Sequence, residues 1–232
     1  ITPPDLDSFG YQEYLENLCT NQDYSCNQFD NPRVYSVVGS RSCPFKCTFC
    51  YHPVGDKYRE RTVENLIEEI EGAVKKYDIN CINIYDELFA YRRERLNNFC
   101  KEMKRINDSR ETELKWTCQL AVSHVDQELL HTMREAGCDI ISFGFESYAP
   151  EVLKSMRKPA KQPQIKAAFY AALKEKISVQ ANFIFGDIAE TVGTAETTLK
   201  FWKEECRGQV SLGFIQPYPG SGVYQHCLKK GI

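Results

Sequence analysis

The sequence lacks the features that mark several large classes of protein. No apolar run approaches the ~20 residues that a membrane-spanning helix needs, and the first residues do not have the pattern of a signal peptide. There is no dense block of lysine and arginine, and the formal net charge is -3, so no nucleic-acid-binding footprint is visible. We therefore expect a soluble, cytoplasmic protein.

Several catalytic motifs are also missing. No GxGxxG follows the first predicted strand, and the chain contains neither a nucleophile elbow nor a phosphate-binding loop. The four histidines form no HxH or HxxxH pair, so we interpret them as surface or structural residues, with His52 alone close in sequence to the motif described next. No residue can be assigned as a catalytic acid, base or nucleophile from the sequence.

Cysteine, in contrast, is abundant, with eleven residues. Cys43, Cys47 and Cys50 have the spacing CxxxCxxC, which lets one short loop direct three thiolates to a single centre. A closed zinc site takes four protein ligands, and an ordinary electron-transfer cluster is held by four cysteines. Three cysteines on an iron-sulfur cube leave one iron open to a ligand that is not protein. A zinc site completed by a distant Cys or His is the alternative.

The remaining cysteines have other predicted roles. Those in predicted strands and helices suit small buried hydrophobic residues rather than a disulfide framework, and we expect them to be reduced: Cys81, Cys100, Cys118 and Cys206. Cys138 is likewise not expected to bind the cluster. Cys19 and Cys26 could pair with each other or join an auxiliary cluster.

From residue 33 onward, short apolar runs alternate with segments of helical periodicity. The predicted strands are residues 34–39, 81–85, 114–119, 140–145, 179–185 and 210–216. The predicted helices are residues 62–77, 93–106, 126–136, 163–176 and 194–205. This alternation predicts an α/β fold with a parallel sheet of six strands, two fewer than a closed barrel. We expect residues 1–33 to form a linker or cap and residues 34–232 to form the core domain of a longer chain.

The cysteine loop resembles the signature of the radical S-adenosylmethionine (radical SAM) superfamily, CxxxCx(aromatic)C, and matches it at every defined position. The resemblance implies a 4Fe-4S cluster on Cys43, Cys47 and Cys50. The amino and carboxylate groups of S-adenosylmethionine would bind its open iron. It also implies a partial, three-quarter TIM barrel, (β/α)6, in which the cluster loop follows the first strand, as it does here.

Carboxylates follow two other predicted strands, where parallel α/β folds collect their chemistry. By the resemblance, Asp86 and Glu87 receive the methionine ammonium group, although acidic residues at a helix start also suit the helix dipole. Glu146 lies in a stretch similar to the family pattern Gly-x-Glu-Ser and is expected near the ribose or amino group of the cofactor. Ser147 belongs to the same pattern or caps the segment that follows.

The last two predicted strands carry further family resemblances. Gly186 stands where the family brings the backbone against the adenine and ribose, although the three residues after it depart from the usual Leu-Pro-Gly. Pro217 and Tyr218 lie in a Pro-Tyr-Pro-Gly stretch that is common in the branch with an N-terminal cobalamin-binding domain. By the same resemblance, other cofactor-binding residues are Phe49, Tyr51 and Gln119.

The implied function is reductive cleavage of S-adenosylmethionine to a 5'-deoxyadenosyl radical, with cobalamin as a candidate methyl carrier. The implied partners are a small-molecule or peptide substrate and an electron donor such as flavodoxin or ferredoxin. The alternatives are a radical SAM enzyme without cobalamin, of the methylthiotransferase or oxidative decarboxylase type, and a non-catalytic iron-sulfur or zinc module.

Overall fold

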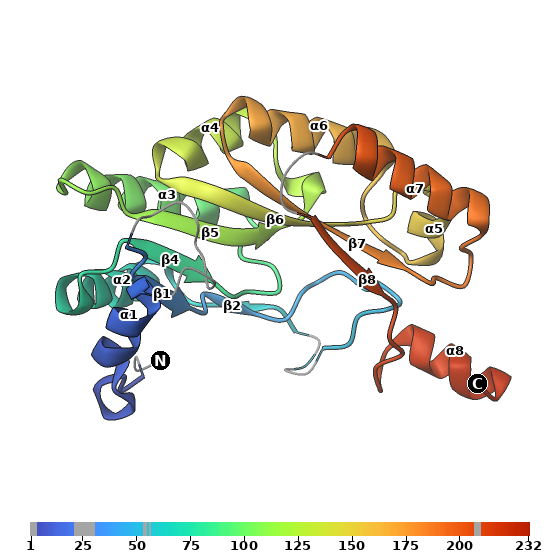
Figure 1. The fold of residues 1–232 in the computed structure, drawn as a ribbon, viewed down its shortest axis with the longest axis horizontal. Helices are drawn as coiled ribbons and strands as arrows, with labels where there is room; N and C mark the ends of the chain where they lie inside the picture. Colours follow the sequence, from blue (N-terminus) through green and yellow to red (C-terminus); the bar gives the residue numbers. More distant parts are fainter. Residues whose placement is uncertain (1–3, 21–30, 53–54, 56, 207–209) are drawn as a thin grey trace.

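The computed structural model describes residues 4–20, 31–52, 55, 57–206 and 210–232, and its centre is one curved parallel sheet (Figure 1). The strand order is β1-β4-β5-β6-β7-β8, and every neighbouring pair is parallel. The strands are β1 (Val34–Val37), β4 (Cys81–Ile84), β5 (Lys115–Leu120), β6 (Cys138–Glu146), β7 (Ser178–Phe185) and β8 (Val210–Phe214). This topology confirms the predicted partial barrel.

Helices cover the outer side of the curved sheet (Figure 1). The helices between strands are α2 (Val63–Tyr77), α3 (Arg93–Asp108), α4 (Gln127–Glu135), α5 (Pro150–Ser155), α6 (Gln162–Lys174) and α7 (Val192–Glu204). The side chain of Thr62 caps α2 by accepting a hydrogen bond from the N–H of Asn65, and Asp126 caps α4 in the same way. No helix in the described ranges is long and apolar enough to span a membrane.

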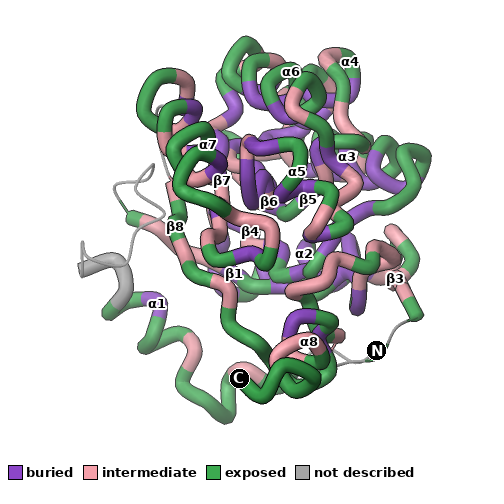
Figure 2. The backbone as a smooth tube through the Cα atoms, turned by 90° about the vertical axis from the view of Figure 1, so that its right-hand side faces the viewer, coloured by how far each residue is buried: buried purple, intermediate pink, exposed green. Residues whose placement is uncertain are grey.

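The core lies between the helices and the sheet, where buried residues concentrate (Figure 2). Strands β5, β6 and β7 alternate strictly over most of their length between buried and less buried positions. The buried positions, such as Trp116, Phe143 and Ala181, pack in the main hydrophobic cluster. The opposite face of each strand carries Thr117, Ser142, Gln180 and similar residues, so the concave side of the sheet is polar.

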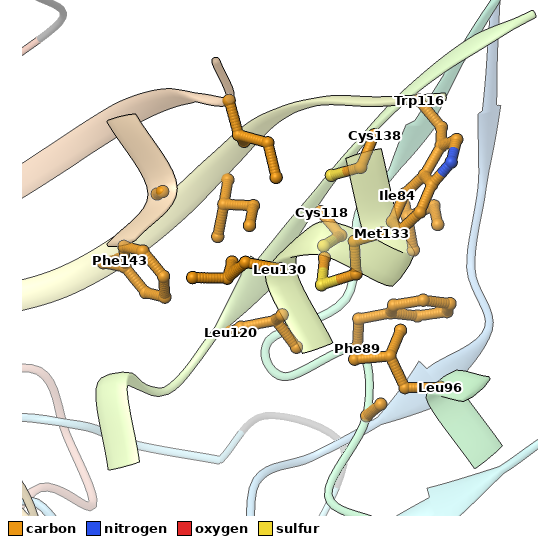
Figure 3. Packing of buried hydrophobic residues seen from close by; sticks show 14 of the residues in the cluster. Ile84, Phe89, Leu96, Trp116, Cys118, Leu120, Leu130, Met133, Cys138 and Phe143 are labelled. Carbon is orange, nitrogen blue, oxygen red and sulfur yellow. The ribbon is translucent and has the colours of Figure 1, made fainter. Parts of the chain in front are cut away.

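The cysteines in this core behave as predicted. Cys118 and Cys138 are buried and pack beside Leu130, Met133 and Trp116 (Figure 3). Cys81, Cys100 and Cys206 are buried as well, and all of them are free thiols. Cys26 lies outside the described residues, as does the side chain of Cys19.

Four of the described elements do not belong to the alternating pattern of strands and helices. Helix α1 (Tyr11–Thr20) packs on the main core through Leu15, and Tyr11 contacts Tyr35 and Tyr77 edge to face. Strands β2 (Ser40–Arg41) and β3 (Arg59–Glu60) form a short antiparallel pair around the cysteine loop. Helix α8 (Gly222–Lys230) follows β8 and lies on the concave side, below the sheet in Figure 1.

Candidate functional site

The cysteine loop lies beyond the C-terminal end of β1 and is held between two helices. The N–H of Thr48 donates to the carbonyl of Met156 at the end of α5, at 2.9 Å. The carbonyl of Thr48 accepts from the N–H of Val223 in α8, also at 2.9 Å. Gly222 packs so closely that a Cβ atom there would lie 3.2 Å from the Thr48 carbonyl oxygen. Backbone contacts on both sides therefore fix the loop that carries the cysteines.

The three thiols of this loop share one electrostatic environment. Burial raises the pKa of Cys43 and Cys47, and it raises that of Cys50 to about 12, while the nearby Lys158 ammonium lowers all three. No group of three or more His, Cys, Asp and Glu side chains in the described part of the chain converges as ligands of one metal ion do. In a cluster each cysteine binds a different iron, so its thiolates need not meet around a single ion.

Glu146 and Lys158 form a mostly buried ion pair beside the cysteines. The distance from Lys158 Nζ to Glu146 Oε1 is 2.8 Å. Burial opposes the charge of Lys158, but Glu146 and the nearby cysteines outweigh it and raise the pKa of the ammonium group. Glu146 ends β6 at a register irregularity with φ of 61°, a conformation that is costly for a residue other than glycine. A Cβ atom at Gly144 would clash with Glu146 Oε1, so only glycine leaves room for the ion pair at this position.

The neighbouring carboxylates Asp86 and Glu87 have different environments. Asp86 is buried; its Oδ1 accepts from the N–H of Gly39 at 2.8 Å, and its Oδ2 has no hydrogen-bond partner among the described residues. Burial raises the pKa of Asp86 to about 6. Glu87 is partly exposed, and its Oε2 lies 3.7 Å from Nδ1 of His52, beyond the third cysteine. Glu87 is thus the carboxylate of the two that a ligand can approach from the concave side.

Ser147 and Gly186, two further predicted cofactor residues, have different surroundings. Ser147 is fully buried, and its hydroxyl group bonds with Thr198 and the N–H of Ala149, which favours the capping alternative. Gly186 has φ of 99°, and its N–H donates to the carboxylate of Glu190. Apart from the two residues next to Gly186 in the chain, only Ile215 among the described residues has atoms within 4 Å of a Cβ built at Gly186.

Four predicted cofactor residues, three aromatic and one proline, lie in or near the cysteine loop. Phe49 packs on the small apolar cluster of α5 that contains Val152 and Met156. Tyr51 and Tyr218 are both partly exposed, and their rings face each other with centroids 5.3 Å apart. Pro217, which precedes Tyr218, is exposed. The segment after β8 therefore reaches the loop through both Tyr218 and the start of α8.

A cavity of about 470 Å³ opens on the concave side of the sheet, and the predicted residues Asp86, Glu87 and Gln119 line it. The other lining residues are Asn83, Ile84, Tyr85, Thr117, Cys118, Ile140, Ser142 and Gln180. The polar residues of this list, Asn83, Thr117, Ser142 and Gln180, were not predicted from the sequence. They stand as polar residues at alternate positions of otherwise apolar strands, which is the pattern that could have identified them. The same reasoning did not foresee the contact of Gly222 with Thr48, since the sequence gives no sign of which segment packs on the loop.

The family model of the Radical SAM superfamily matches residues 37–201. The chain belongs to the radical SAM superfamily. The match spans the cysteine loop, Glu146 and Gly186, and it confirms the resemblance drawn from the motifs. Radical SAM proteins use a 4Fe-4S cluster and S-adenosylmethionine, and three cysteines on one loop are a suitable donor set for such a cluster.

Curated relatives support the same assignment. An uncharacterized methyltransferase of Pyrococcus horikoshii is 28% identical over 198 residues, which is 84% of this chain and 42% of the relative. An anaerobic magnesium-protoporphyrin IX monomethyl ester cyclase of Rubrivivax gelatinosus is 29% identical over 203 residues, 86% of this chain and 36% of the relative. The chain thus spans less than half the length of these two relatives.

Among solved structures, the radical S-adenosylmethionine methyltransferase TsrM from Kitasatospora setae, with cobalamin and a 4Fe-4S cluster bound, aligns with a TM-score of 0.78. The identity is 16%, and the alignment covers 86% of this chain and 37% of that one. At this identity the match establishes the radical SAM fold.

Proposed function

We propose that this chain is the core of a radical SAM enzyme that cleaves S-adenosylmethionine reductively. The observation that carries the proposal is the three-cysteine loop beyond β1, fixed beside the Glu146–Lys158 pair and the concave cavity. When bound, the cluster and S-adenosylmethionine supply one electron and a 5'-deoxyadenosyl radical that takes a hydrogen atom from the substrate.

The roles of the protein side chains follow from their placement. Cys43, Cys47 and Cys50 would bind three irons and leave the fourth open. Lys158 would offset part of the negative charge that three thiolates bring to a half-buried loop, as its effect on their pKa values indicates. Glu146 holds Lys158 in place at 2.8 Å. Once the cysteines have lost their protons and bound iron, these residues hold the cluster and balance its charge, and none of them needs to exchange a proton.

Toward S-adenosylmethionine, Glu87 is the carboxylate that can accept the methionine ammonium, with Asp86 behind it. Phe49 and the backbone near Gly186 would lie against the adenosyl group, while Tyr51, Pro217 and Tyr218 would close the side next to α8. Ser147 would act indirectly by holding the turn after Glu146.

The reaction outcome proposed is methyl transfer or ring formation on an organic small molecule or peptide, with cobalamin as methyl carrier. The methyltransferase and cyclase relatives support this class. An external one-electron donor of the flavodoxin or ferredoxin type would reduce the cluster. The exposed basic residues Lys46, within the cysteine loop, and Arg157, whose carbonyl group lies next to Cys47, suit an acidic protein. A reduced cluster also suits the cytoplasm.

Anaerobic reconstitution tests the proposal. We expect the parent chain to bind iron and sulfide and to form 5'-deoxyadenosine from S-adenosylmethionine under dithionite, and we expect Cys47→Ala to lose most of both. Cys227→Ala, a free and partly buried thiol in α8, is the matched control and should keep the parental iron content. Full iron content in Cys47→Ala would contradict the cluster assignment. A cluster without 5'-deoxyadenosine would favour the non-catalytic module.

A further inference from the structure

The cavity on the concave side of the sheet is lined by a row of neutral polar side chains in addition to the carboxylates Asp86 and Glu87. Gln119, Ser142 and Gln180 are direct neighbours in register on β5, β6 and β7. All three line the cavity. Because they alternate with core residues along their strands, their side chains belong to the concave face of the sheet.

This row has unused hydrogen-bonding capacity. In the part of the chain that the structure describes, neither the Gln119 nor the Gln180 side chain has a hydrogen-bond partner. Ser142 Oγ accepts from Asn182 Nδ2 at 2.8 Å, so its own hydroxyl hydrogen is still available. Each glutamine offers two N–H donors and a carbonyl acceptor. Three neighbouring residues thus present both donors and acceptors to the same space.

A second row lies next to the first. Asn83, Thr117 and Ile140 are in register on β4, β5 and β6 and also line the cavity. The Thr117 hydroxyl donates to Asn83 Oδ1 at 2.7 Å, which orients the Asn83 amide nitrogen away from Thr117. Among the described residues, no hydrogen bond uses that nitrogen. The donors and acceptors therefore continue over two rows, with Ile140 as an apolar contact.

The charges of the cavity restrict the ligand further. Its described lining includes two carboxylates, Asp86 and Glu87, and no lysine or arginine. A phosphate or carboxylate group in the two rows would meet no positive charge, and burying an unpaired anion is costly. A fully apolar ligand would remove water from the amides without replacing its hydrogen bonds, which is also unfavourable.

We propose that these rows bind an uncharged, amide-bearing part of the substrate, through Gln119, Ser142 and Gln180. This inference rests on the proposed function, because it takes the cavity beside the cysteine loop as the substrate site. It assigns to the substrate Gln119, which the family resemblance assigned to the cofactor. It also names a substrate chemistry that differs from the porphyrin in the name of the cyclase relative.

Ligand-observed saturation-transfer NMR can test the assignment on the anaerobically reconstituted chain with S-adenosylhomocysteine present. The probes are N-acetylglycinamide as a neutral amide, methylphosphonate as an anion and toluene as an apolar ligand. We expect N-acetylglycinamide to bind in preference to the other two. Gln180→Leu should weaken its binding about tenfold, the effect of losing roughly one neutral hydrogen bond. Gln225→Leu, on the exposed side of α8, is the matched control and should bind as the parent does.

Preferential binding of methylphosphonate or toluene, or equal amide binding by the parent and Gln180→Leu, would overturn the assignment. If Gln180→Leu lacks the circular dichroism of the parent, Gln180→Glu replaces it, because that change keeps the shape and removes the N–H donors; the same tenfold loss is expected. Iron content and 5'-deoxyadenosine formation by the parent test the proposed function separately. If the parent binds the amide but neither binds iron nor forms 5'-deoxyadenosine, the proposed function is contradicted while the amide-binding site is supported.

Discussion

Asp86 is a buried carboxyl group, and within the described part of the chain only one of its oxygens is hydrogen-bonded. Because burial raises its folded-state pKa to about 6, the folded protein keeps this proton over a pH range in which the unfolded chain, with a pKa near 3.8, has released it. The folded state then binds more protons than the unfolded state, so the free energy of unfolding falls as pH rises. Asp86 therefore favours folding at low pH and opposes it at neutral pH.

The prediction from this carboxyl group concerns Asp86→Asn. An asparagine oxygen can still accept from Gly39, but its side chain does not titrate. Relative to the parent, Asp86→Asn should gain up to about 3 kcal/mol in free energy of unfolding between about pH 4 and pH 7, and the difference should level off above that range. Urea unfolding of the cluster-free proteins across this range measures the difference. A stability difference that does not change with pH would show that Asp86 titrates normally.

Gly186 shows a limit of sequence reasoning at the same scale. The family resemblance explained this glycine by close approach of a cofactor, but the structure adds a second reason, since φ is 99°. A side chain is strained at this φ whatever lies nearby. A Gly186→Val variant would thus combine backbone strain with any steric effect on the cofactor. The sequence has no signal that separates the two causes.

At the scale of elements, helix α8 braces the cysteine loop through a close backbone contact. Val223 donates to Thr48, and Gly222 leaves no room for a larger residue next to that carbonyl group. Gly222→Val should push α8 away from the loop, lower stability by roughly 1–3 kcal/mol and weaken retention of the cluster. Iron content after gel filtration of the reconstituted protein measures the retention.

Gly72→Val is the matched control for this prediction. Gly72 lies in α2, and apart from its chain neighbours and the backbone of its own helix no described atom comes within 4 Å of the position that a Cβ atom would take there, so valine meets open space. Its effect on stability should stay within about 0.5 kcal/mol, because valine and glycine differ little in helix propensity. Parental iron retention by Gly222→Val would mean that α8 does not brace the loop.

The periodic elements were predictable because each has its own local signal. The strands and the five long helices between them match the prediction within a few residues at their ends, since burial on one side imposes periods of two or 3.6 residues. The short helix α5, helix α8 and the β2–β3 pair were not predicted. Each is stabilised by distant contacts, as α8 is by Thr48, and such contacts leave no periodic pattern. The cysteine loop could be predicted because its three metal-binding residues lie close together in the sequence.

The pairing of Glu146 with Lys158 illustrates the same division within the site. The sequence indicated Glu146 from its position after a strand, but the ion pair depends on the register irregularity in β6 and on the space at Gly144. The polar rows of the cavity depend likewise on the register between strands, which brings Gln119, Ser142 and Gln180 together from distant segments. Sequence patterns fix the face on which a residue lies, whereas its neighbours come from the assembled sheet.

At the scale of the whole molecule, the parallel sheet ends in two edges, β1 and β8. The β8 edge is the more apolar, because Leu212 is 46% and Phe214 is 81% exposed. Ile188 and Val192, which follow β7, are exposed as well. No described strand pairs with the outer side of β8. An edge strand with exposed backbone groups and apolar side chains favours pairing with another chain, and a net charge of -3 provides little repulsion against it.

We therefore expect the 232-residue chain to self-associate through β8. Phe214→Lys places a charge on the edge strand, a common protection of natural sheet edges, and should shift the chain toward monomer. Sedimentation velocity over a concentration series measures the shift. Leu173→Lys is the matched control, because Leu173 is a similarly exposed apolar residue on helix α6, away from any sheet edge. If Leu173→Lys reduces association as much as Phe214→Lys does, general surface hydrophobicity is responsible rather than the open edge. A parent chain that is monomeric at every concentration would contradict self-association through β8.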